Sequence, residues 1–299
     1  MPQTRVVVVG SANMDLVGMA PALPRPGETV LGSDFVMLPG GKGANQAIAA
    51  ALAGASCAFL GAIGSDAFGV TLRARITAAG VDTGQLRVVY GASGVALVMV
   101  NADGENAILV TPGANSAFTG LTEGELAAVR EADVLVAQLE VPVETVTEAA
   151  VAARAAGTRV VLNAAPARQV PADLLAAVDL LVVNEGEAHA LTGRGRDEPE
   201  ALLALVPRAV LTLGGEGAWY VDRDGAAVHV PAVKVDVVDS TAAGDAFTAA
   251  LAVAWGEGRD LLDAVHWAAA AGAACVRRLG ASVALPRRFE IDELYAPPA

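Results

Sequence analysis

The chain has 299 residues, of which 54 % are hydrophobic and 18 % are charged, and its net charge is −13. This composition supplies a large core and excludes a disordered protein, and the negative charge argues against a nucleic-acid or anionic-membrane partner. The two cysteines, Cys57 and Cys275, lie in apolar segments without a CxxC partner, and there are only three histidines. A metal cluster of these residue types is therefore not expected, and buried thiols favour a reducing, cytoplasmic location.

Two apolar stretches near the start of the chain resemble membrane or targeting signals. The four valines after Arg5 are too short an apolar run for a signal peptide. The uncharged stretch 43–65 is long enough to span a bilayer, but it is mostly alanine with glycines inside. Its first half has the pattern of a helix and its second half that of a strand, so we interpret it as a buried helix–strand pair and expect no membrane partner.

Strands alternate with helices for most of the length. Strands are predicted at 5–10, 57–63, 134–137, 159–162, 180–183, 209–213 and 233–238. Helices are predicted at 44–53, 68–79, 123–130, 143–156, 171–177, 188–192, 198–206, 243–255 and 264–276. Repeated βα units imply right-handed crossovers, so we expect an α/β fold with a doubly wound, mostly parallel sheet flanked by helices. The whole chain, 1–299, is expected to form a single domain.

Two segments, about 14–38 and 88–111, interrupt this alternation. The first contains three prolines before short β-like pieces, and the second alternates in two runs about the turn 101–105, which predicts a hairpin. We interpret them as one small antiparallel β lid that excludes water from a reaction, although an edge sheet without a function is the alternative. An exposed antiparallel edge also invites pairing with a second copy, so we expect a homodimer through the lid.

Polar residues and glycines follow the predicted strands. Ligands of an open parallel sheet bind beyond the carboxyl ends of its strands, so these residues predict the rim of an active site. They are Ser11, Asn13, Asp15, Glu140, Asn163, Asn184, Glu187, the glycine-rich stretch 214–217 and the turn 239–245.

The turn 239–245 joins a β-branched run, 233–238, to an apolar helix. Such a strand–turn–helix leaves the backbone N–H groups of Ala243, Gly244 and Asp245 unpaired at a helix N-terminus, where they can bind an anion. Asp245 places a carboxylate beside that anion site, which is typical of a base that deprotonates a nucleophile attacking phosphorus. The alternative is that a polar residue at 239–241 simply caps the helix.

The stretch 40–46, Gly-Gly-Lys-Gly-Ala-Asn-Gln, is the second informative motif. Its glycines allow a tight turn and a close backbone approach before a helix, but Lys42 is not followed by the Ser or Thr of a Walker A loop. The amides of Asn45 and Asn13 and the carboxylate of Asp15 suit a polyol, whose hydroxyls both donate and accept. The alternatives are a solvated loop lysine at 42 and an Asx-turn cap at 13–15.

Asn184 begins the sequence Asn-Glu-Gly-Glu, which opens a predicted helix. Acids in the first turn favour the helix dipole, and that alone would explain Glu185 and Glu187. The functional alternative is a Mg²⁺ site held through waters, because Mg²⁺ prefers one or two carboxylates together with phosphate oxygens.

Taken together, these residues resemble the ribokinase-like carbohydrate kinase superfamily from Val6 to about Pro286. The matching stretches are 10–15, 26–30, 40–46, 163–167, 184–187, 212–217 and 239–245. The glycine-lysine motif and the Ala-Ala-Gly-Asp turn are specific to the superfamily. The complete 40–46 string with the pair Asn13 and Asp15 is similar to the ribokinases within it.

The resemblance implies in-line transfer of the γ-phosphoryl group of ATP to O5 of D-ribose. Asp245 would be the general base, and the backbone N–H groups of Ala242, Ala243 and Gly244 would form the anion hole. The sugar would be held by Asn13, Asp15, Gly41, Lys42, Gly43, Asn45, Glu140 and Asp245. We expect Asp245, at a helix N-terminus, to stay ionised as a weak base, which suffices because phosphoryl transfer asks chiefly for alignment.

The resemblance also implies nucleotide and metal sites. The nucleotide would contact Asn184, Thr212, Gly214, Gly217 and Gly244, and Glu187 would help to place Mg²⁺. An activating monovalent cation, K⁺, would be held by Asp239 and Thr241, with further ligands at Cys275, Arg278, Gly280 and Ala284. The chain departs from the family pattern at Ala284, where ribokinases often have Ser, and at Ala269, where relatives commonly have His or Asn beside the adenine.

Three alternatives stay open. The nearest is a kinase of the same superfamily for 2-deoxyribose or a ketose. Asn13 favours a sugar with the hydroxyl that deoxyribose lacks, since leaving the Asn13 amide unpaired costs about 1–3 kcal/mol. A dinucleotide-binding oxidoreductase is suggested by the valine run before Gly10 but lacks the Gly-x-Gly-x-x-Gly motif. A non-catalytic sugar-binding protein is disfavoured by Asp245.

Overall fold

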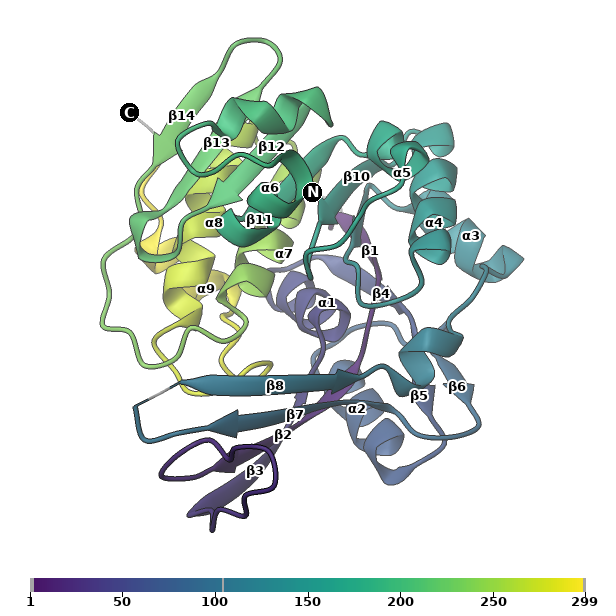
Figure 1. The fold of residues 1–299 in the computed structure, drawn as a ribbon. Helices are drawn as coiled ribbons and strands as arrows, with labels where there is room; N and C mark the ends of the chain where they lie inside the picture. Colours follow the sequence, from purple (N-terminus) through teal and green to yellow (C-terminus); the bar gives the residue numbers. More distant parts are fainter. Residues whose placement is uncertain (1–2, 104, 298–299) are drawn as a thin grey trace.

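The fold is described by a computed structural model for residues 3–103 and 105–297. Its main sheet has the strand order β14-β13-β12-β11-β10-β9-β1-β4 (Figure 1). The strands are β1 (Arg5–Val9), β4 (Ser56–Leu60), β9 (Val134–Ala137), β10 (Arg159–Asn163), β11 (Leu180–Asn184), β12 (Arg208–Thr212), β13 (Ala218–Asp222) and β14 (Ala227–Val230). The strands from β12 to β4 run parallel, and β13 and β14 extend the sheet antiparallel. The predicted doubly wound, mostly parallel sheet is confirmed.

The valine run of β1 shows why the sheet has helices on both faces. Val6 and Val8 belong to one hydrophobic core and Val7 and Val9 to the other, because successive side chains of a strand point to opposite faces. The first core is covered by α1 (Lys42–Leu52), α2 (Ala67–Ala78), α7 (Ala243–Gly256), α8 (Leu261–Cys275) and α9 (Arg288–Leu294). The second is covered by α3 (Glu123–Glu131), α4 (Val143–Ala156), α5 (Ala172–Ala177) and α6 (Glu185–Thr192).

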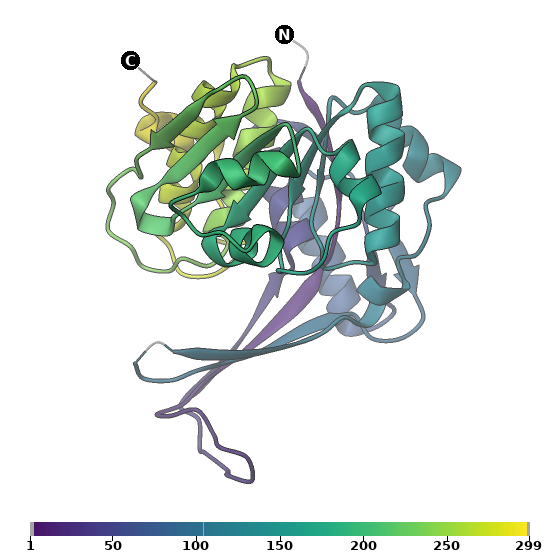
Figure 2. The same cartoon turned by 45° about the horizontal axis from the view of Figure 1, so that its top comes forward.

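The lid is a separate four-stranded sheet that projects from the body (Figure 2). Its order is β3-β2-β7-β8, formed by β2 (Asn13–Met19), β3 (Asp34–Gly40), β7 (Gly94–Val100) and β8 (Asn106–Thr111). The pairs β2–β3 and β7–β8 are antiparallel, as predicted, whereas β2 and β7 pair in parallel at the centre. Gly104, within the predicted turn 101–105, lies outside the described residues.

Two predicted elements take a different form in the structure. The strand 57–63 is split into β4 and β5 (Ala62–Gly64), and β5 pairs with β6 (Arg87–Val89) in a third, two-stranded sheet. Gly61 separates them where a Cβ would lie 2.5 Å from the Gly10 oxygen. The helix predicted at 198–206 is the 3-10 helix η2 (Pro199–Ala204).

The strand predicted at 233–238 is wrong. The backbone N–H groups of Val238 and Asp239 both donate to the Val276 carbonyl, at 2.8 and 3.2 Å, instead of to a neighbouring strand. The side chains of Val237 and Val238 are 68 % and 60 % exposed. A β-branched run forms a strand only where a sheet offers it a partner, and this segment has none among the described strands.

The hairpin β13–β14 and the helix α9 were not predicted. The short α9 is held by side chains distant in sequence: Trp267 donates from Nε1 to Asp292 Oδ1 at 2.8 Å, and the guanidinium of Arg288 lies 5.3 Å from the centre of the Trp267 ring. None of the helices in residues 3–103 and 105–297 is long and apolar enough to cross a membrane.

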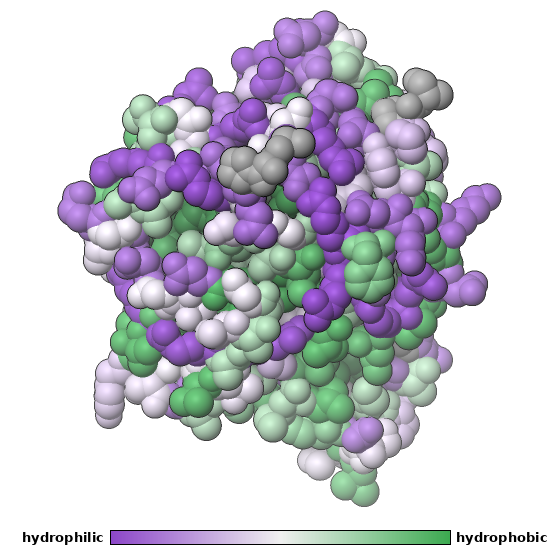
Figure 3. Space-filling view, turned by 180° about the vertical axis from the view of Figure 1, so that it is seen from behind, coloured by the Kyte–Doolittle hydropathy of each residue, from purple (hydrophilic) through white to green (hydrophobic). Residues whose placement is uncertain are grey.

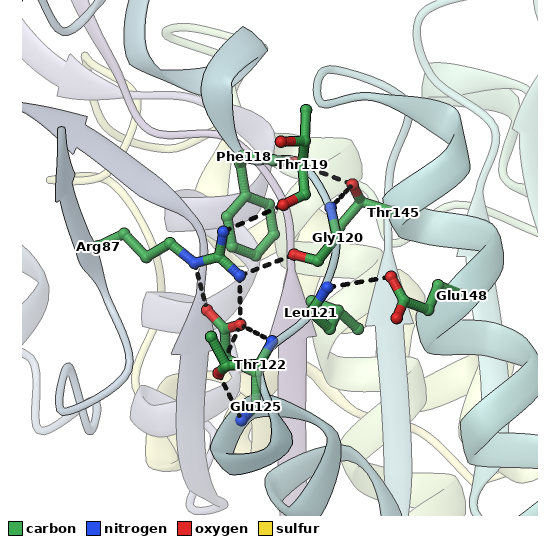
Figure 4. A network of polar contacts seen from close by, with 9 residues as sticks. All are labelled: Arg87, Phe118, Thr119, Gly120, Leu121, Thr122, Glu125, Thr145 and Glu148. Atoms are coloured by element: carbon green, nitrogen blue, oxygen red, sulfur yellow. Dashed lines mark hydrogen bonds and ion pairs between the residues drawn. The ribbon is translucent and has the colours of Figure 1, made fainter.

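Arg87 fixes the connection that leads from the lid to α3 (Figure 4). It donates from Nε to Glu125 Oε1 at 2.7 Å and from Nη2 to the Gly120 carbonyl at 2.7 Å, and it also contacts Glu125 Oε2. The Glu125 side chain is only 1 % exposed and caps α3 together with Thr122. The same connection begins with the 3-10 helix η1 (Gly113–Ala117), which carries Asn115 to the edge of the main sheet.

Candidate active site

Asp245 lies where the N-terminal turns of α1 and α7 meet. Its side chain is buried, with the residue 6 % exposed. Its Oδ2 accepts a hydrogen bond from Asn45 Nδ2 at 3.0 Å, and its Oδ1 accepts one from Gln46 Nε2 at 2.9 Å. The carboxylate is therefore held by the helix that follows the glycine-lysine motif.

The pKa of Asp245 is raised above its ordinary value. Burial is the largest cause, and the attraction of Lys42 and the hydrogen bonds from Gln46 and Asn45 only partly offset it. The sequence predicts that the helix N-terminus keeps Asp245 ionised as a weak base; burial, which the sequence does not show, acts on its pKa in the opposite direction. A carboxylate with a raised pKa is a better proton acceptor once ionised.

Ala242 gives the turn before α7 its shape. It has φ 62°, and no other non-glycine residue in the described ranges has a positive φ. No side chain caps α7, so the capping alternative is not supported. The N–H of Ala243 donates to the Ser240 carbonyl at 3.2 Å, which corrects the prediction that it is unpaired. The N–H groups of Ala242, Gly244 and Asp245 make no hydrogen bond within the described residues and can serve an anion.

The predicted sugar residues gather beside this turn. Gly41, with φ 90°, precedes α1, and a Cβ there would lie 2.7 Å from the Asn13 nitrogen of β2. A Cβ on Gly43 would lie 2.5 Å from the Ser11 nitrogen, so both glycines are required for α1 to start against the sheet. Glu140 follows β9 and accepts from the Lys42 N–H at 3.1 Å.

Charges are concentrated in this region. The pKa of Asp15 is raised to about 7 by burial and by the nearby carboxylates of Glu140 and Asp245. Burial lowers the pKa of Lys42, but attraction by Asp245, Glu140 and Glu187 outweighs it, and the net shift is upward. One ammonium group therefore stabilises several carboxylates that approach each other, and the site holds the acceptors and donors that a polyol needs.

Asn115 belongs to this site but was not predicted. It is buried in η1, its Oδ1 accepts from the Ala12 N–H at 3.0 Å, and its Nδ2 donates to Asn13 Oδ1 at 2.7 Å. Because the Asn13 oxygen faces Asn115, the N–H donors of the Asn13 amide are left to bind a ligand. Asn115 and Asn13 are 102 positions apart, and no local pattern connects them.

Asn184 and Glu187 form a capping box at the start of α6. Asn184 Oδ1 accepts from the Glu187 N–H at 2.8 Å, and Glu187 Oε2 accepts from the Asn184 N–H at 2.9 Å. The pKa of Glu187 is raised, with burial as the largest cause and the Asp245 charge adding to it, against the lowering by the Asn184 N–H and Lys42. Capping thus explains one Glu187 oxygen, and the other accepts no hydrogen bond within the described residues, so it could hold a Mg²⁺-bound water.

The predicted nucleotide residues lie on neighbouring strands. Thr212 at the end of β12 pairs with Asn184 at the end of β11. Gly214 and Gly217 bracket the 3-10 helix η3 (Gly214–Glu216) with φ 55° and 104°. A Cβ on Gly217 would lie 2.0 Å from the Val230 oxygen, so no other residue fits there. Asn184, Thr212, Gly214 and Gly217 therefore share one edge of the site.

The predicted cation residues come together from two segments. Asp239 Oδ1 accepts from Thr241 Oγ1 at 2.6 Å, and Asp239 Oδ2 accepts from the Gly280 N–H at 2.9 Å. Burial raises the Asp239 pKa, but these hydrogen bonds lower it by more, so its carboxylate is ionised at neutral pH. Cys275 Sγ lies 3.7 Å from the Thr241 carbonyl oxygen.

The donor set fits a weakly bound monovalent cation, with one exception. In the part of the chain that the structure describes, no three His, Cys, Asp or Glu side chains gather for a metal ion. A cation near Asp239 would therefore depend on backbone carbonyls, as the predicted ligands at Cys275, Arg278 and Gly280 require. The exception is Ala284, which has no side-chain oxygen to add to this set and whose carbonyl accepts a hydrogen bond from Arg278 Nη2 at 3.1 Å.

Comparisons with known proteins agree with this arrangement. The pfkB family carbohydrate kinase profile matches residues 3–288. The chain is 36 % identical to the ribokinase of Haemophilus influenzae (96 % of this chain, 97 % of the relative) and 37 % identical to that of Bacillus subtilis (97 % and 99 %). A deoxyribokinase of Salmonella typhi is 34 % identical, over 96 % of this chain and 97 % of its own length.

Solved structures show the same fold. The Arabidopsis thaliana ribokinase complexed with ribose and ATP superposes with a TM-score of 0.92 at 32 % identity, over 98 % of this chain and 99 % of that one. The Thermotoga maritima ribokinase superposes with a TM-score of 0.90 at 33 % identity, over 97 % and 99 %. The chain therefore belongs to the pfkB family of carbohydrate kinases, as its sequence motifs indicated.

Proposed function

We propose that this kinase transfers the γ-phosphoryl group of ATP to O5 of D-ribose. The observation that carries the proposal is the buried Asp245 carboxylate, held by Asn45 and Gln46 beside the free N–H groups of Ala242 and Gly244. A base next to an anion hole is the arrangement that phosphoryl transfer to an alcohol requires. The likeness to a ribokinase solved with ribose and ATP supports the choice of both substrates.

The reaction follows from the geometry. The primary hydroxyl of the sugar hydrogen-bonds to Asp245, which takes its proton as the oxygen attacks the γ-phosphorus. The N–H groups of Ala242 and Gly244, with the dipole of α7, stabilise the charge on the transferring group, and ADP leaves. The ammonium group of Lys42 favours the ionised forms of Asp245 and Glu187 and partly offsets the effect of their burial. Mg²⁺, placed by Glu187 through water, would neutralise the phosphate oxygens. K⁺ at Asp239 and Thr241 would stabilise the turn that carries the N–H donors.

The nearest alternative substrate is 2-deoxyribose, since one relative is a deoxyribokinase. Asn115 orients the Asn13 amide so that its donors face the site, and a sugar without the matching hydroxyl would leave them unpaired. We expect ribose to exceed deoxyribose in kcat/KM by about tenfold or more. An ADP-release panel over ribose, deoxyribose, fructose and nucleosides, in KCl and in NaCl of equal ionic strength, tests this. A higher kcat/KM for another sugar would overturn the choice of ribose.

Sugar binding should depend on pH through Asp15. Its pKa of about 7 means that, in the sugar-free enzyme, the carboxyl is largely protonated at pH 6 and ionised at pH 8. An ionised Asp15 accepts hydroxyl hydrogen bonds, so we expect ribose affinity at pH 6 to be about tenfold weaker than at pH 8. Calorimetric titrations across this range measure it, and Asp15→Asn should give a flat profile. A constant Kd in the unmodified enzyme would contradict the role of Asp15.

The lid should join two copies of the chain. In Figure 3 hydrophobic side chains gather in the lower part of the molecule, where the lid lies in Figure 1. On the lid, Phe35, Met37, Met99 and Ile108 are 57 %, 55 %, 41 % and 58 % exposed. Burying them against a second lid across a two-fold axis removes this apolar surface from water. A monomer in light scattering at micromolar concentration would argue against this assembly.

Two further expectations complete the proposal. The chain is taken as one domain over 1–299, with a lid formed by about 14–38 and 88–111, because the lid strands continue from elements of the main body. A cytoplasmic location is supported by the use of ATP and by the free, buried thiols of Cys57 and Cys275.

A further inference from the structure

A chain of buried carboxamides lies behind Asp245. Gln46 is fully buried and gives one Nε2 hydrogen to Asp245 Oδ1 at 2.9 Å and the other to Asn163 Oδ1 at 3.0 Å. Its Oε1 accepts from Gln138 Nε2, and Asn163 Nδ2 donates to the Val182 carbonyl at 3.2 Å. Both hydrogens of the Gln46 amide are therefore used, and its oxygen is bonded as well.

This chain determines which way the Gln46 amide faces. A flipped amide would put its oxygen against the Asp245 carboxylate and Asn163 Oδ1, and its NH₂ group against that of Gln138. The far end of the chain is closely packed: a Cβ on Gly10 would lie 2.0 Å from Gln138 Oε1, an oxygen that has no hydrogen-bond partner among the described residues. Residues from α1 and from the ends of β9 and β10 thus present a donor to Asp245 from one side.

The two Asp245 oxygens differ in their surroundings. Oδ1 faces Gln46, which is shut off from solvent, whereas Oδ2 faces Asn45, whose own Oδ1 has no partner among the described residues. A buried amide oxygen without a partner fits a site where a ligand hydroxyl would donate. Oδ2 is therefore the oxygen on the side where a sugar hydroxyl would bind.

We propose that Gln46 is a positioning residue for phosphoryl transfer, which holds Oδ1 of Asp245 so that Oδ2 receives the proton of the sugar hydroxyl. The inference rests on the proposed function. In the step, the O–H bond of the sugar breaks and an Oδ2–H bond forms, while the O5–phosphorus bond forms and the bond from phosphorus to the ADP oxygen breaks. The proton leaves Asp245 to solvent after the products dissociate.

Gln46→Met tests this role, because it keeps the side-chain length and removes the donor. We expect kcat to fall about tenfold to a hundredfold, the loss of one hydrogen bond to a charged group, with KM for ribose within about threefold. The acid limb of the kcat profile should move about one pH unit or more upward, since Asp245 loses a group that favours its ionised form. A ¹³C-aspartate NMR titration of the sugar-free protein should show the same rise in the Asp245 pKa.

Two further variants separate positioning from a general loss of structure. Gln138→Met is the matched control, because it breaks the same chain one link farther from Asp245 and should move the pH profile by less than about half a unit. Gln46→Glu, when protonated, can donate to Oδ1, so it should exceed Gln46→Met in kcat at low pH and fall below it at high pH.

Failure of the proposed function and failure of the Gln46 role give different results. Inactivity of the unmodified enzyme on every sugar tested refutes the proposed function, whereas the NMR titration still reports on the contact between Gln46 and Asp245. An unchanged pH profile and Asp245 pKa in Gln46→Met, in an otherwise active enzyme, refute the role of Gln46. Equal shifts of the kcat pH profile in Gln46→Met and Gln138→Met also refute the role of Gln46.

Discussion

Asp245→Asn is expected to keep sugar binding and to lose at least about a thousandfold in turnover. The change removes the proton acceptor but not the volume of the side chain. Calorimetry with ribose and steady-state ADP release measure the two effects separately.

The matched control is Asp260→Asn. Asp260 also stands at a helix N-terminus, where it caps α8 by accepting from the Asp263 N–H at 2.9 Å, but it lies outside the proposed site. Its turnover should stay within about twofold of the unmodified enzyme, since Asn also caps a helix and a change in capping affects stability and not chemistry. Turnover near the unmodified level in Asp245→Asn would refute the assignment of Asp245 as the base.

Arg87→Met should destabilise the fold by about 3–5 kcal/mol, a large share of the roughly 5–15 kcal/mol that stabilises a typical domain. The substitution leaves Glu125, 1 % exposed, without its ion-pair partner (Figure 4). It also removes the donors to the carbonyls of Thr119 and Gly120 and the contact of the guanidinium, 4.7 Å from the Phe118 ring centre. Urea denaturation gives the change in unfolding free energy.

Two controls for Arg87→Met are a substitution in a more exposed ion pair and the dependence of its effect on pH. Arg154→Met removes an ion pair with Asp179 whose arginine side chain is 56 % exposed, and should cost at most about 1 kcal/mol. Burial raises the Glu125 pKa, but the hydrogen bonds from Arg87 and Thr122 lower it by more. The pair therefore contributes above the ordinary glutamate pKa, and the difference between variant and unmodified protein should shrink as the pH falls below about 4.5. An equal loss of unfolding free energy in both arginine variants would contradict the larger contribution predicted for the buried ion pair.

Much of the fold follows from local patterns. The predicted bounds of β9 and of α4 agree with the structure, because a short apolar run and a long helical pattern each match one element length. The polar residues after successive strands share one edge, since parallel strands place their carboxyl ends together. The segment 233–238 shows where such patterns fail: its valines suit a strand, but pairing depends on a neighbour that only the assembled sheet can supply.

The candidate site was likewise predictable from the sequence only in part. The proposed base and the glycines around it could be selected from the sequence, because a helix start after small residues has the same chemistry in any fold. The pKa and the orientation of Asp245 could not be inferred from the sequence. Its raised pKa comes chiefly from burial, and its Oδ1 accepts a hydrogen bond from Gln46, which is 199 positions away.

The amino-acid sequence by itself determined the layered α/β architecture, the lid and the residue types at the sheet edge, since these depend on periodicity and on motifs of a few residues. Only the tertiary structure decided the orientation of the carboxamides of Gln46, Asn115 and Gln138 and the protonation energetics of Asp15 and Asp245. Hydrogen-bond direction and desolvation depend on what surrounds a side chain in three dimensions, and here the surrounding groups come from segments that are distant in the chain.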